Sequence, residues 1–152
     1  MSKNSKRPAL FIDRDGTINR DCPYCHEVSD LFIYEDAVTL IRDYAERGFL
    51  IIVVTNQSGI GRGLFTVQDL EKFNAAMKEK IRELGGRIDD IYYCPHLPES
   101  GCSCRKPATG MIMQAVSDHD IDLSRSVVAG DRDDIDGELA RRLGIPFILV
   151  RH

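Results

Sequence analysis

The chain has 152 residues, of which 43% are hydrophobic and 29% are charged, and its formal net charge is −4. This length suffices for one domain with a hydrophobic core but not for two, so we expect residues 1–152 to form a single domain. A negative net charge without a basic stripe does not fit a general nucleic-acid binder. The longest apolar run is far shorter than the roughly 20 residues that a membrane helix needs, so we expect no membrane partner.

Five short apolar runs recur along the chain, and each predicts a strand. They lie at residues 9–12, 49–54, 91–93, 126–130 and 146–150. Because these runs are continuous and do not alternate with polar residues, they are typical of strands buried on both faces of a parallel sheet.

Helical patterns separate the apolar runs. Apolar side chains at spacings of three and four occur in residues 37–44, 67–84, 112–116 and 139–143. Thr66 and Asp69 stand where a capping box would start the second helix, and Gly144 stands where the last helix would stop. The alternation of strand and helix predicts an α/β fold with a doubly wound sheet of about five parallel strands. In such a sheet, ligands bind beyond the carboxyl ends of the strands.

Two carboxylates end the first predicted strand, in the sequence DRDGT. Asp13 and Asp15 are two residues apart on an extended segment, so both can face one pocket. Oxygen ligands of this kind suit a divalent cation of the magnesium type. Taken alone, the motif is also compatible with a solvated acidic turn.

Polar groups also stand at three further strand or loop ends. Thr55 begins the turn TNQSG, whose hydroxyl and backbone N–H groups suit an anion. Arg105 and Lys106 bring two cations to the start of the third helix, and Asp131 opens the acidic sequence DRDDID. Together these groups supply the metal ligands, anion site and cations that phosphoryl transfer needs.

These segments, FIDRDGTIN, VVTNQSG, CRKP and AGDRDDID, resemble in order the four motifs of the haloacid dehalogenase (HAD) superfamily of phosphatases. The resemblance implies that Asp13 is the nucleophile that forms an aspartyl-phosphate. It implies that Asp15 protonates the leaving oxygen and then activates water, while Thr55 and Lys106 bind phosphoryl oxygens. Mg²⁺ would be held by Asp13, the backbone carbonyl of Asp15, and Asp131.

In this superfamily a second acidic residue supports the metal, and three or four residues separate it from the fourth-motif aspartate. Four residues lie between Asp131 and Asp136, whereas only two separate Asp131 from Asp134. Asp136 is therefore the expected supporting acid. The segments between the motifs are too short for a cap domain, so we expect a capless enzyme.

Residues 94–104, CPHLPESGCSC, form a candidate zinc loop. Its possible ligands are two pairs with one residue between their members, Cys94 with His96 and Cys102 with Cys104, and each pair points to one side of extended chain. Joined by a short loop, they can close a tetrahedral Cys₃His site of the structural zinc type. Unrelated thiols and a surface histidine are the alternative. The loop resembles that of D-glycero-D-manno-heptose-1,7-bisphosphate phosphatases and the related histidinol-phosphate phosphatases.

The resemblance implies a small phosphorylated substrate, most closely the 7-phosphate of a heptose 1,7-bisphosphate. The implied substrate contacts are Asp21, Tyr24, Asn56, Gln57, Ser58 and Arg105, with Arg132 where a lysine often stands. Only five residues separate His96 from Cys102, as in histidinol-phosphate phosphatases, so histidinol phosphate or another small sugar phosphate is the alternative substrate. The alternatives in other classes are a zinc-binding interaction module, a thiol oxidoreductase and a nucleic-acid 3′-phosphatase.

The sequence CPYCH at residues 22–26 offers a second cysteine motif. A redox Cys-x-x-Cys would begin a helix directly after the first strand, and no helical pattern follows here. As zinc ligands, Cys22, Cys25 and His26 lack a fourth partner. We therefore predict a flap over the substrate, which we define as residues 21–26. We expect a cytoplasmic monomer, and cytoplasmic cysteines should be reduced.

Overall fold

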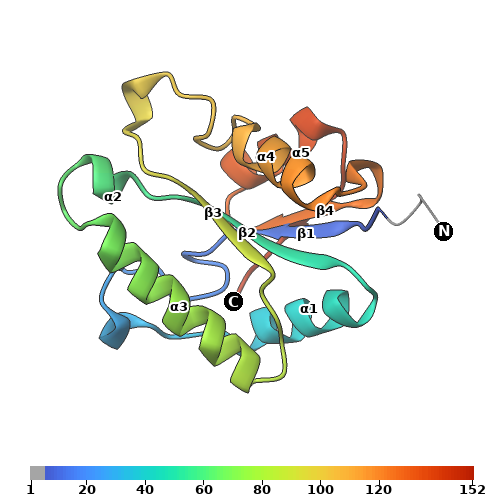
Figure 1. Ribbon diagram of the computed structural model, residues 1–152, viewed down its shortest axis with the longest axis horizontal. Coiled ribbons are helices and arrows are strands. Elements are labelled where there is room, and N and C mark those ends of the chain that lie inside the picture. Colours follow the sequence, from blue (N-terminus) through green and yellow to red (C-terminus); the bar gives the residue numbers. More distant parts are fainter. Residues whose placement is uncertain (1–5) are drawn as a thin grey trace.

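The computed structural model describes residues 6–152, so residues 1–5 of the predicted domain lie outside the described part (Figure 1). One sheet of five parallel strands has the order β3-β2-β1-β4-β5. The strands are β1 (Ala9–Ile12), β2 (Leu50–Asn56), β3 (Asp90–Cys94), β4 (Val127–Gly130) and β5 (Phe147–Leu149). The predicted α/β class and its five parallel strands are confirmed. β2 extends two residues beyond its predicted end, so Thr55 and Asn56 belong to the strand.

The helices are α1 (Glu35–Glu46), α2 (Ser58–Gly61), α3 (Val67–Glu83), α4 (Gly110–His119) and α5 (Glu138–Leu143). The 3₁₀ turns are η1 (Val28–Asp30), η2 (Pro98–Ser100) and η3 (Leu123–Arg125), and η4 (Asp133–Gly137) is a π-helical turn. The capping box of Thr66 and Asp69 opens α3 as predicted, and Gly144 caps α5 at a φ of 69°. The sequence did not predict α2. None of the described helices is both long and apolar enough to cross a membrane.

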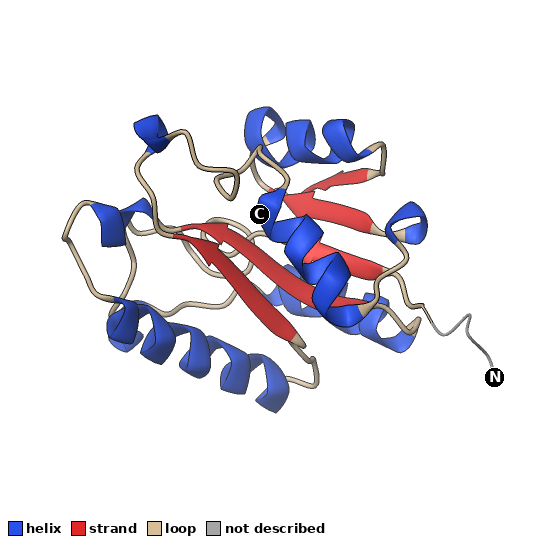
Figure 2. Ribbon diagram, turned by 45° about the horizontal axis from the view of Figure 1, so that its top comes forward, coloured by secondary structure: helices blue, strands red, loops and turns tan. Residues whose placement is uncertain are grey.

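Helices cover both faces of the sheet, which explains the continuous apolar runs (Figures 1 and 2). Leu10 and Ile12 of β1 belong to a core with residues of α1 and α3. Phe11, between them, belongs to the opposite core with residues of α4 and α5. All three side chains are fully buried, because alternate residues of one strand face opposite sides of the sheet.

The order of the strands places β1 between β2 and β4, where the direction of winding reverses. Ligands of doubly wound sheets bind at such a point, beyond the carboxyl ends of the strands. In the described chain, only η1 and α1 lie between β1 and β2, and α2, α3, β3, η2, α4 and η3 lie between β2 and β4. Among the described residues, loops therefore lie above the end of β1, and no separate domain is inserted between β1 and β4.

Candidate active site

A cavity of about 440 Å³ lies at the carboxyl ends of β1, β2 and β4. Its lining includes the predicted residues Asp13, Asp15, Asp21, Tyr24, Thr55, Asn56, Gln57, Ser58, Arg105, Lys106, Asp131 and Arg132. Pro23, Ile135 and Asp136 complete the lining. The structure thus brings together every side chain predicted for catalysis, magnesium binding or substrate contact.

Asp13 belongs to an acidic cluster with Asp131 and Asp136. One carboxylate oxygen from each residue lies within 4.8 Å of the others. Asp13 continues the alternation of Phe11, so it faces the side of the sheet covered by α4 and α5. There Lys106 Nζ donates to Asp13 Oδ1 and to Asp136 Oδ1, both at 2.8 Å. Lys106 and Asp136 are almost fully buried, which strengthens the ion pairs between them.

Burial and the neighbouring charges shift the pKa values of the groups in this cluster. Burial and the Asp13 carboxylate raise the pKa of Asp136 to about 6. The same two causes raise the pKa of Asp131. Burial opposes the charge of Lys106, but Asp13 and Asp136 outweigh it and raise the pKa of the ammonium group. The cluster therefore has more negative charge than Lys106 alone neutralises.

This arrangement fits a divalent cation. With all groups ionised, three carboxylates and one ammonium leave two negative charges, and carboxylate oxygens are the ligands that Mg²⁺ prefers. Thr17 Oγ1 lies 3.3 Å from both Asp13 Oδ2 and Asp131 Oδ1 and so connects the two acids. Gly16 has a φ of 84°, and a Cβ there would collide with the Asp131 carboxylate. Glycine is thus required for the close approach of the two acidic segments.

Asp136 and Asp134 occupy different environments. Asp136 is 2% exposed and lies in the acidic cluster. Asp134 lies at the surface, where both of its oxygens accept hydrogen bonds from Arg132, at 2.9 and 2.7 Å. The geometry favours Asp136 as the supporting acid, as expected from its spacing. Arg132 lines the cavity, but its guanidinium is paired with Asp134.

Asp15 faces the same cavity but is surrounded by N–H donors. Arg14 Nε and Nη2 donate to its two oxygens at 3.0 Å each. Asn19 Nδ2 and Gln57 Nε2 each donate a further bond, also at 3.0 Å. Asp15 is not part of the acidic cluster, and its two oxygens accept these four hydrogen bonds.

The end of β2 connects the other predicted residues. Gln57 Nε2 donates to Thr55 Oγ1 at 2.9 Å as well as to Asp15, so both hydrogens of its amide group have partners. Asn56 forms a reciprocal pair with the backbone of Lys106: its Oδ1 accepts from Lys106 N at 2.9 Å, and its Nδ2 donates to Lys106 O at 3.2 Å. The predicted substrate contacts Asn56 and Gln57 therefore also hold residues that are predicted to be catalytic.

The zinc loop brings its four candidate ligands together. Ligand atoms of Cys94, His96, Cys102 and Cys104 all lie within 4.8 Å of one another. His96 Nδ1 is 3.2 Å from Cys104 Sγ, and Cys102 Sγ is 3.5 Å from Cys94 Sγ. The sulfur atoms of Cys94 and Cys104 are in direct contact. A disulfide between those two would leave His96 and Cys102 unexplained, whereas a tetrahedral zinc site uses all four donors. The donor set fits zinc.

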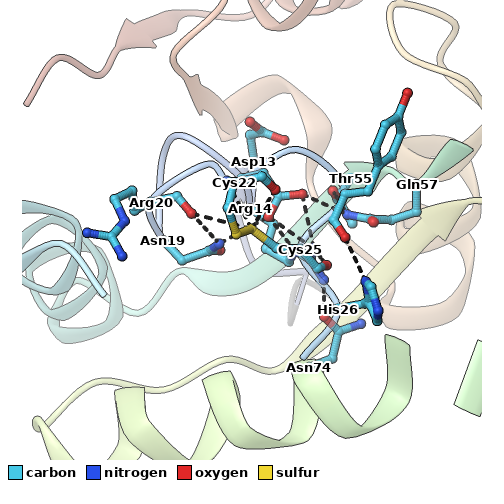
Figure 3. Close-up of polar contacts among 12 residues, drawn as sticks. Asp13, Arg14, Asn19, Arg20, Cys22, Cys25, His26, Thr55, Gln57 and Asn74 are labelled. Atoms are coloured by element: carbon cyan, nitrogen blue, oxygen red, sulfur yellow. Dashed lines mark hydrogen bonds and ion pairs between the residues drawn. A yellow bond between two sulfur atoms is a disulfide. The ribbon is translucent and has the colours of Figure 1, made fainter. Parts of the chain in front are cut away.

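In the flap, where the cysteines are expected to be reduced, the sulfur atoms of Cys22 and Cys25 are in direct contact (Figure 3). The cause is a tight turn that includes Tyr24 at a φ of 61°, which brings the two sulfur atoms together. His26 does not join them, because its ring stacks on Phe65 at 4.9 Å between centroids. In the described chain these three residues form no metal-ligand cluster.

The flap also brings an acid to the cavity. Burial, followed by the charges of Asp15 and Asp13, raises the pKa of Asp21, and Arg14 partly opposes this rise. Tyr24 lies beside Asp21 in the cavity lining and is 42% exposed. Both side chains are thus accessible to a ligand.

Sequence reasoning did not assign roles to Arg14, Thr17 and Asn19. All three belong to the motif FIDRDGTIN and are buried. The alternation along β1 could have indicated that Arg14 is buried, because it places this side chain on the same face of the sheet as Ile12. A buried cation needs partners, and the neighbouring carboxylate of Asp15 was an obvious one.

The sequence and fold are similar to those of known proteins. The family model described as HAD-hydrolase-like matches residues 103–152. A protein of Thermoplasma volcanium, named "Probable D-glycero-D-manno-heptose-1,7-bisphosphate 7-phosphatase", is 58% identical over 143 residues, which are 94% of this chain and 98% of that protein. This chain belongs to the D-glycero-D-manno-heptose-1,7-bisphosphate 7-phosphatase family.

Two further relatives agree with this family. A protein of the same name from Thermoplasma acidophilum is 52% identical over 149 residues, which are 98% of this chain and 93% of that protein. The crystal structure of D,D-heptose 1,7-bisphosphate phosphatase from B. bronchiseptica, complexed with magnesium and phosphate, has a TM-score of 0.83 at 30% identity and covers 93% of this chain and 79% of that chain. The predicted resemblance to HAD phosphatases with a zinc loop is confirmed. The family is one of phosphatases, and one of its solved members was crystallised with magnesium.

Proposed function

We propose that this chain is a Mg²⁺-dependent phosphomonoester hydrolase that removes the 7-phosphate from D-glycero-D-manno-heptose 1,7-bisphosphate. One observation carries the proposal: Asp13 and Asp15 face one cavity from opposite environments, Asp13 beside Lys106 and the acidic cluster, and Asp15 among N–H donors. The relatives that share this family name support the substrate.

In the first step, an Asp13 oxygen attacks the phosphorus, and the bond from phosphorus to the sugar oxygen breaks. Asp15 gives its proton to that oxygen, which leaves as an alcohol. Lys106 and Thr55 bind the oxygens of the phosphoryl group. In the second step, Asp15 takes a proton from a water molecule that attacks the aspartyl-phosphate, and inorganic phosphate leaves Asp13.

Asp13, Asp131 and the backbone carbonyl of Asp15 would hold Mg²⁺, with Asp136 in support. When bound, the cation would offset the negative charge that two carboxylates and a phosphate bring together. Cys94, His96, Cys102 and Cys104 would hold one structural zinc ion, which would fix the loop that precedes Arg105 and Lys106.

Substitution of the nucleophile tests the reaction. Asp13→Asn keeps the size of the side chain but removes the attacking charge, so phosphate release in the presence of Mg²⁺ should fall by at least about 10³-fold. The matched control is Asp134→Asn, which removes a surface carboxylate and should retain wild-type turnover. Undiminished turnover of Asp13→Asn would overturn the mechanism, whereas a wild-type chain that releases no phosphate would leave a zinc-binding module as the better description.

A substrate panel tests the specificity. The panel contains heptose 1,7-bisphosphate in both anomers, histidinol phosphate and simple sugar phosphates. The highest kcat/KM is expected for one anomer of the heptose bisphosphate, with loss of the 7-phosphate only. A higher kcat/KM for histidinol phosphate would replace the proposed substrate.

We also propose that the whole chain is one catalytic domain that acts as a monomer in the cytoplasm on small molecules, without a nucleic-acid partner. Its formal charge of −4 supports the exclusion of nucleic acid. Sedimentation velocity of the purified chain tests the oligomeric state, and a dimer would refute the monomer.

A further inference from the structure

Arg14 is a fully buried cation next to the acid–base residue. Its side chain has no exposed surface, and it follows Ile12 to the side of the sheet that α1 and α3 cover. A charge in this position is unfavourable unless its N–H groups find acceptors. The partners of Arg14 should therefore reveal what the charge contributes.

The guanidinium of Arg14 connects three separate segments (Figure 3). Two parallel bonds of 3.0 Å reach both oxygens of Asp15. Nη1 donates to Asn74 Oδ1 of α3 at 3.0 Å, and Nη2 also donates to the backbone carbonyl of Cys25 in the flap at 3.0 Å. The guanidinium carbon lies 4.3 Å from the centre of the Phe73 ring.

These contacts fix the orientation of Arg14 more than they neutralise its charge. Asn74 Oδ1 and the Cys25 carbonyl are neutral acceptors, and Phe73 covers one side of the guanidinium plane. Asp15 is the only carboxylate among the described contacts of Arg14. A planar guanidinium held at its edges sets the plane of a carboxylate that it meets with two bonds.

The orientation of Asp15 matters because one carboxylate has to serve both steps. It must reach the leaving oxygen in the first step and the attacking water in the second. Misplacement of a reacting group by about 1 Å costs about 10²-fold in rate. Asn19 and Gln57 each hold one oxygen of Asp15, whereas Arg14 holds both.

We propose that Arg14 is a positioning residue that fixes the Asp15 carboxylate for proton transfer and ties the flap backbone at Cys25 to the same point. This inference rests on the proposed phosphatase function. The Arg14 side chain thereby fixes the position of the flap relative to Asp15, and its bond to Asn74 connects both to α3.

Substrates with different leaving groups test the proposal. A sugar alkoxide needs a proton from Asp15 to leave, whereas p-nitrophenolate leaves without one. In Arg14→Lys and Arg14→Gln, the first step on the best sugar phosphate should slow by about 10²-fold, while KM stays nearly unchanged. With p-nitrophenyl phosphate, a rapid burst of one p-nitrophenolate per active site should remain, followed by slow turnover because the second step needs Asp15 as base.

An equal slowing of the first step with both substrates, or no slowing with either, would overturn the inference, because a merely structural arginine does not distinguish leaving groups. Asn74→Ala is a second test variant. It keeps the bonds from Arg14 to Asp15 but removes the acceptor of Arg14 Nη1. Its first step should also slow with the sugar phosphate and not with p-nitrophenyl phosphate, but by a smaller factor. If circular dichroism shows that the Arg14 variants do not fold, this variant tests the proposal in their place. Equal slowing of the first step with both substrates in Asn74→Ala, or no slowing with either, would then overturn the inference.

Arg20→Lys is the matched control, because Arg20 is exposed and its guanidinium lies over Phe32 at 5.0 Å. It should behave as wild type with both substrates, and the same selective defect in this variant would overturn the specific role of Arg14. If the wild-type chain releases no phosphate from any monoester, the proposed function fails, whereas normal wild-type turnover with unselective Arg14 variants refutes the inference alone.

Discussion

The zinc loop and the flap both carry closely spaced cysteines next to the cavity, but they contribute opposite charges. The zinc loop leads directly into Arg105 and Lys106, whereas the flap brings Asp21. Four ligand atoms converge in the zinc loop. The flap is held by the contact of Cys22 with Cys25, by the bond from Arg14 to the Cys25 carbonyl and by the stacking of His26 on Phe65. The groups that surround a cysteine pair therefore determine whether it can bind a metal.

Among the changes that compare the two loops, loss of the zinc ligands should have the largest effect. Cys104→Ser, or treatment with a zinc chelator, should lower kcat by about 10²-fold, because Lys106 follows the loop by two residues and would be misplaced. Metal analysis of the wild type should find about one zinc per chain, as a closed four-ligand site requires. Metal-free protein with full activity would contradict a stabilising role of zinc.

Asn56→Ala should have the second largest effect, since it removes the reciprocal bonds to the Lys106 backbone. We expect the free energy of unfolding to fall by about 2 kcal/mol, as for a partly buried amide pair, with a lower kcat as well. Asn56→Asp is the comparison variant, because it keeps the acceptor for Lys106 N but places a second acceptor against Lys106 O, so it tests the bond to Lys106 O alone. Denaturant unfolding and phosphatase assays measure both quantities. Wild-type stability in Asn56→Ala would show that the bonds from Asn56 to the Lys106 backbone do not stabilise the fold.

The acidic cluster beneath the zinc loop predicts a pH dependence that the flap does not share. The pKa of Asp136, about 6, is above its ordinary value of 3.8, so the folded metal-free chain gains stability from this group as the pH falls from 7 towards 4. Mg²⁺ has to displace that proton, so its affinity should fall by up to about tenfold per pH unit below 6 for each proton displaced.

Calorimetric titration with Mg²⁺ between pH 5 and 7.5 measures this dependence. Asp134→Asn should leave the profile unchanged, because this carboxylate is paired with Arg132 at the surface. A Mg²⁺ affinity that does not vary over this range would exclude Asp136 from the metal site.

Loss of the flap cysteines should have the smallest effect. In Cys22→Ser with Cys25→Ser, phosphatase activity should stay within about twofold, because neither sulfur reaches the acidic cluster and a serine hydroxyl can replace Cys25 Sγ as acceptor for Cys22 N. Assays with and without a reducing agent complete the test. A large loss would show that the cysteines of the flap, like those of the zinc loop, are needed for activity.

Much of the site was predictable from sequence because motif residues follow strands whose ends meet. Asp13, Thr55 and Asp131 lie at or just beyond the ends of three adjacent parallel strands, so their convergence follows from the sheet. Lys106 was predictable from its motif. The alternation of strands and helices gave the fold class but did not determine the order of the strands.

Other features depend on contacts that no local pattern encodes. The bond from Arg14 to Asn74 joins residues 60 positions apart, and the amphipathic period of α3 indicates only that Asn74 lies near the buried face. The sequence of α2, SGIG, has low helix propensity, so only its tertiary environment makes it helical. The contact of Cys22 with Cys25 in the flap follows from a turn at Tyr24 with positive φ, which tyrosine seldom adopts.

The central place of β1 also governs how the molecule is completed during synthesis. β1 leaves the ribosome first among the strands, yet its partner on one side, β4, begins at Val127, so Leu10 waits for a residue 117 positions later. Until then β1 exposes an apolar edge with unpaired backbone groups, which is a known hazard for aggregation. A chain that stops before β4 would lack Asp131 and would leave the strand carrying the nucleophile open to other chains.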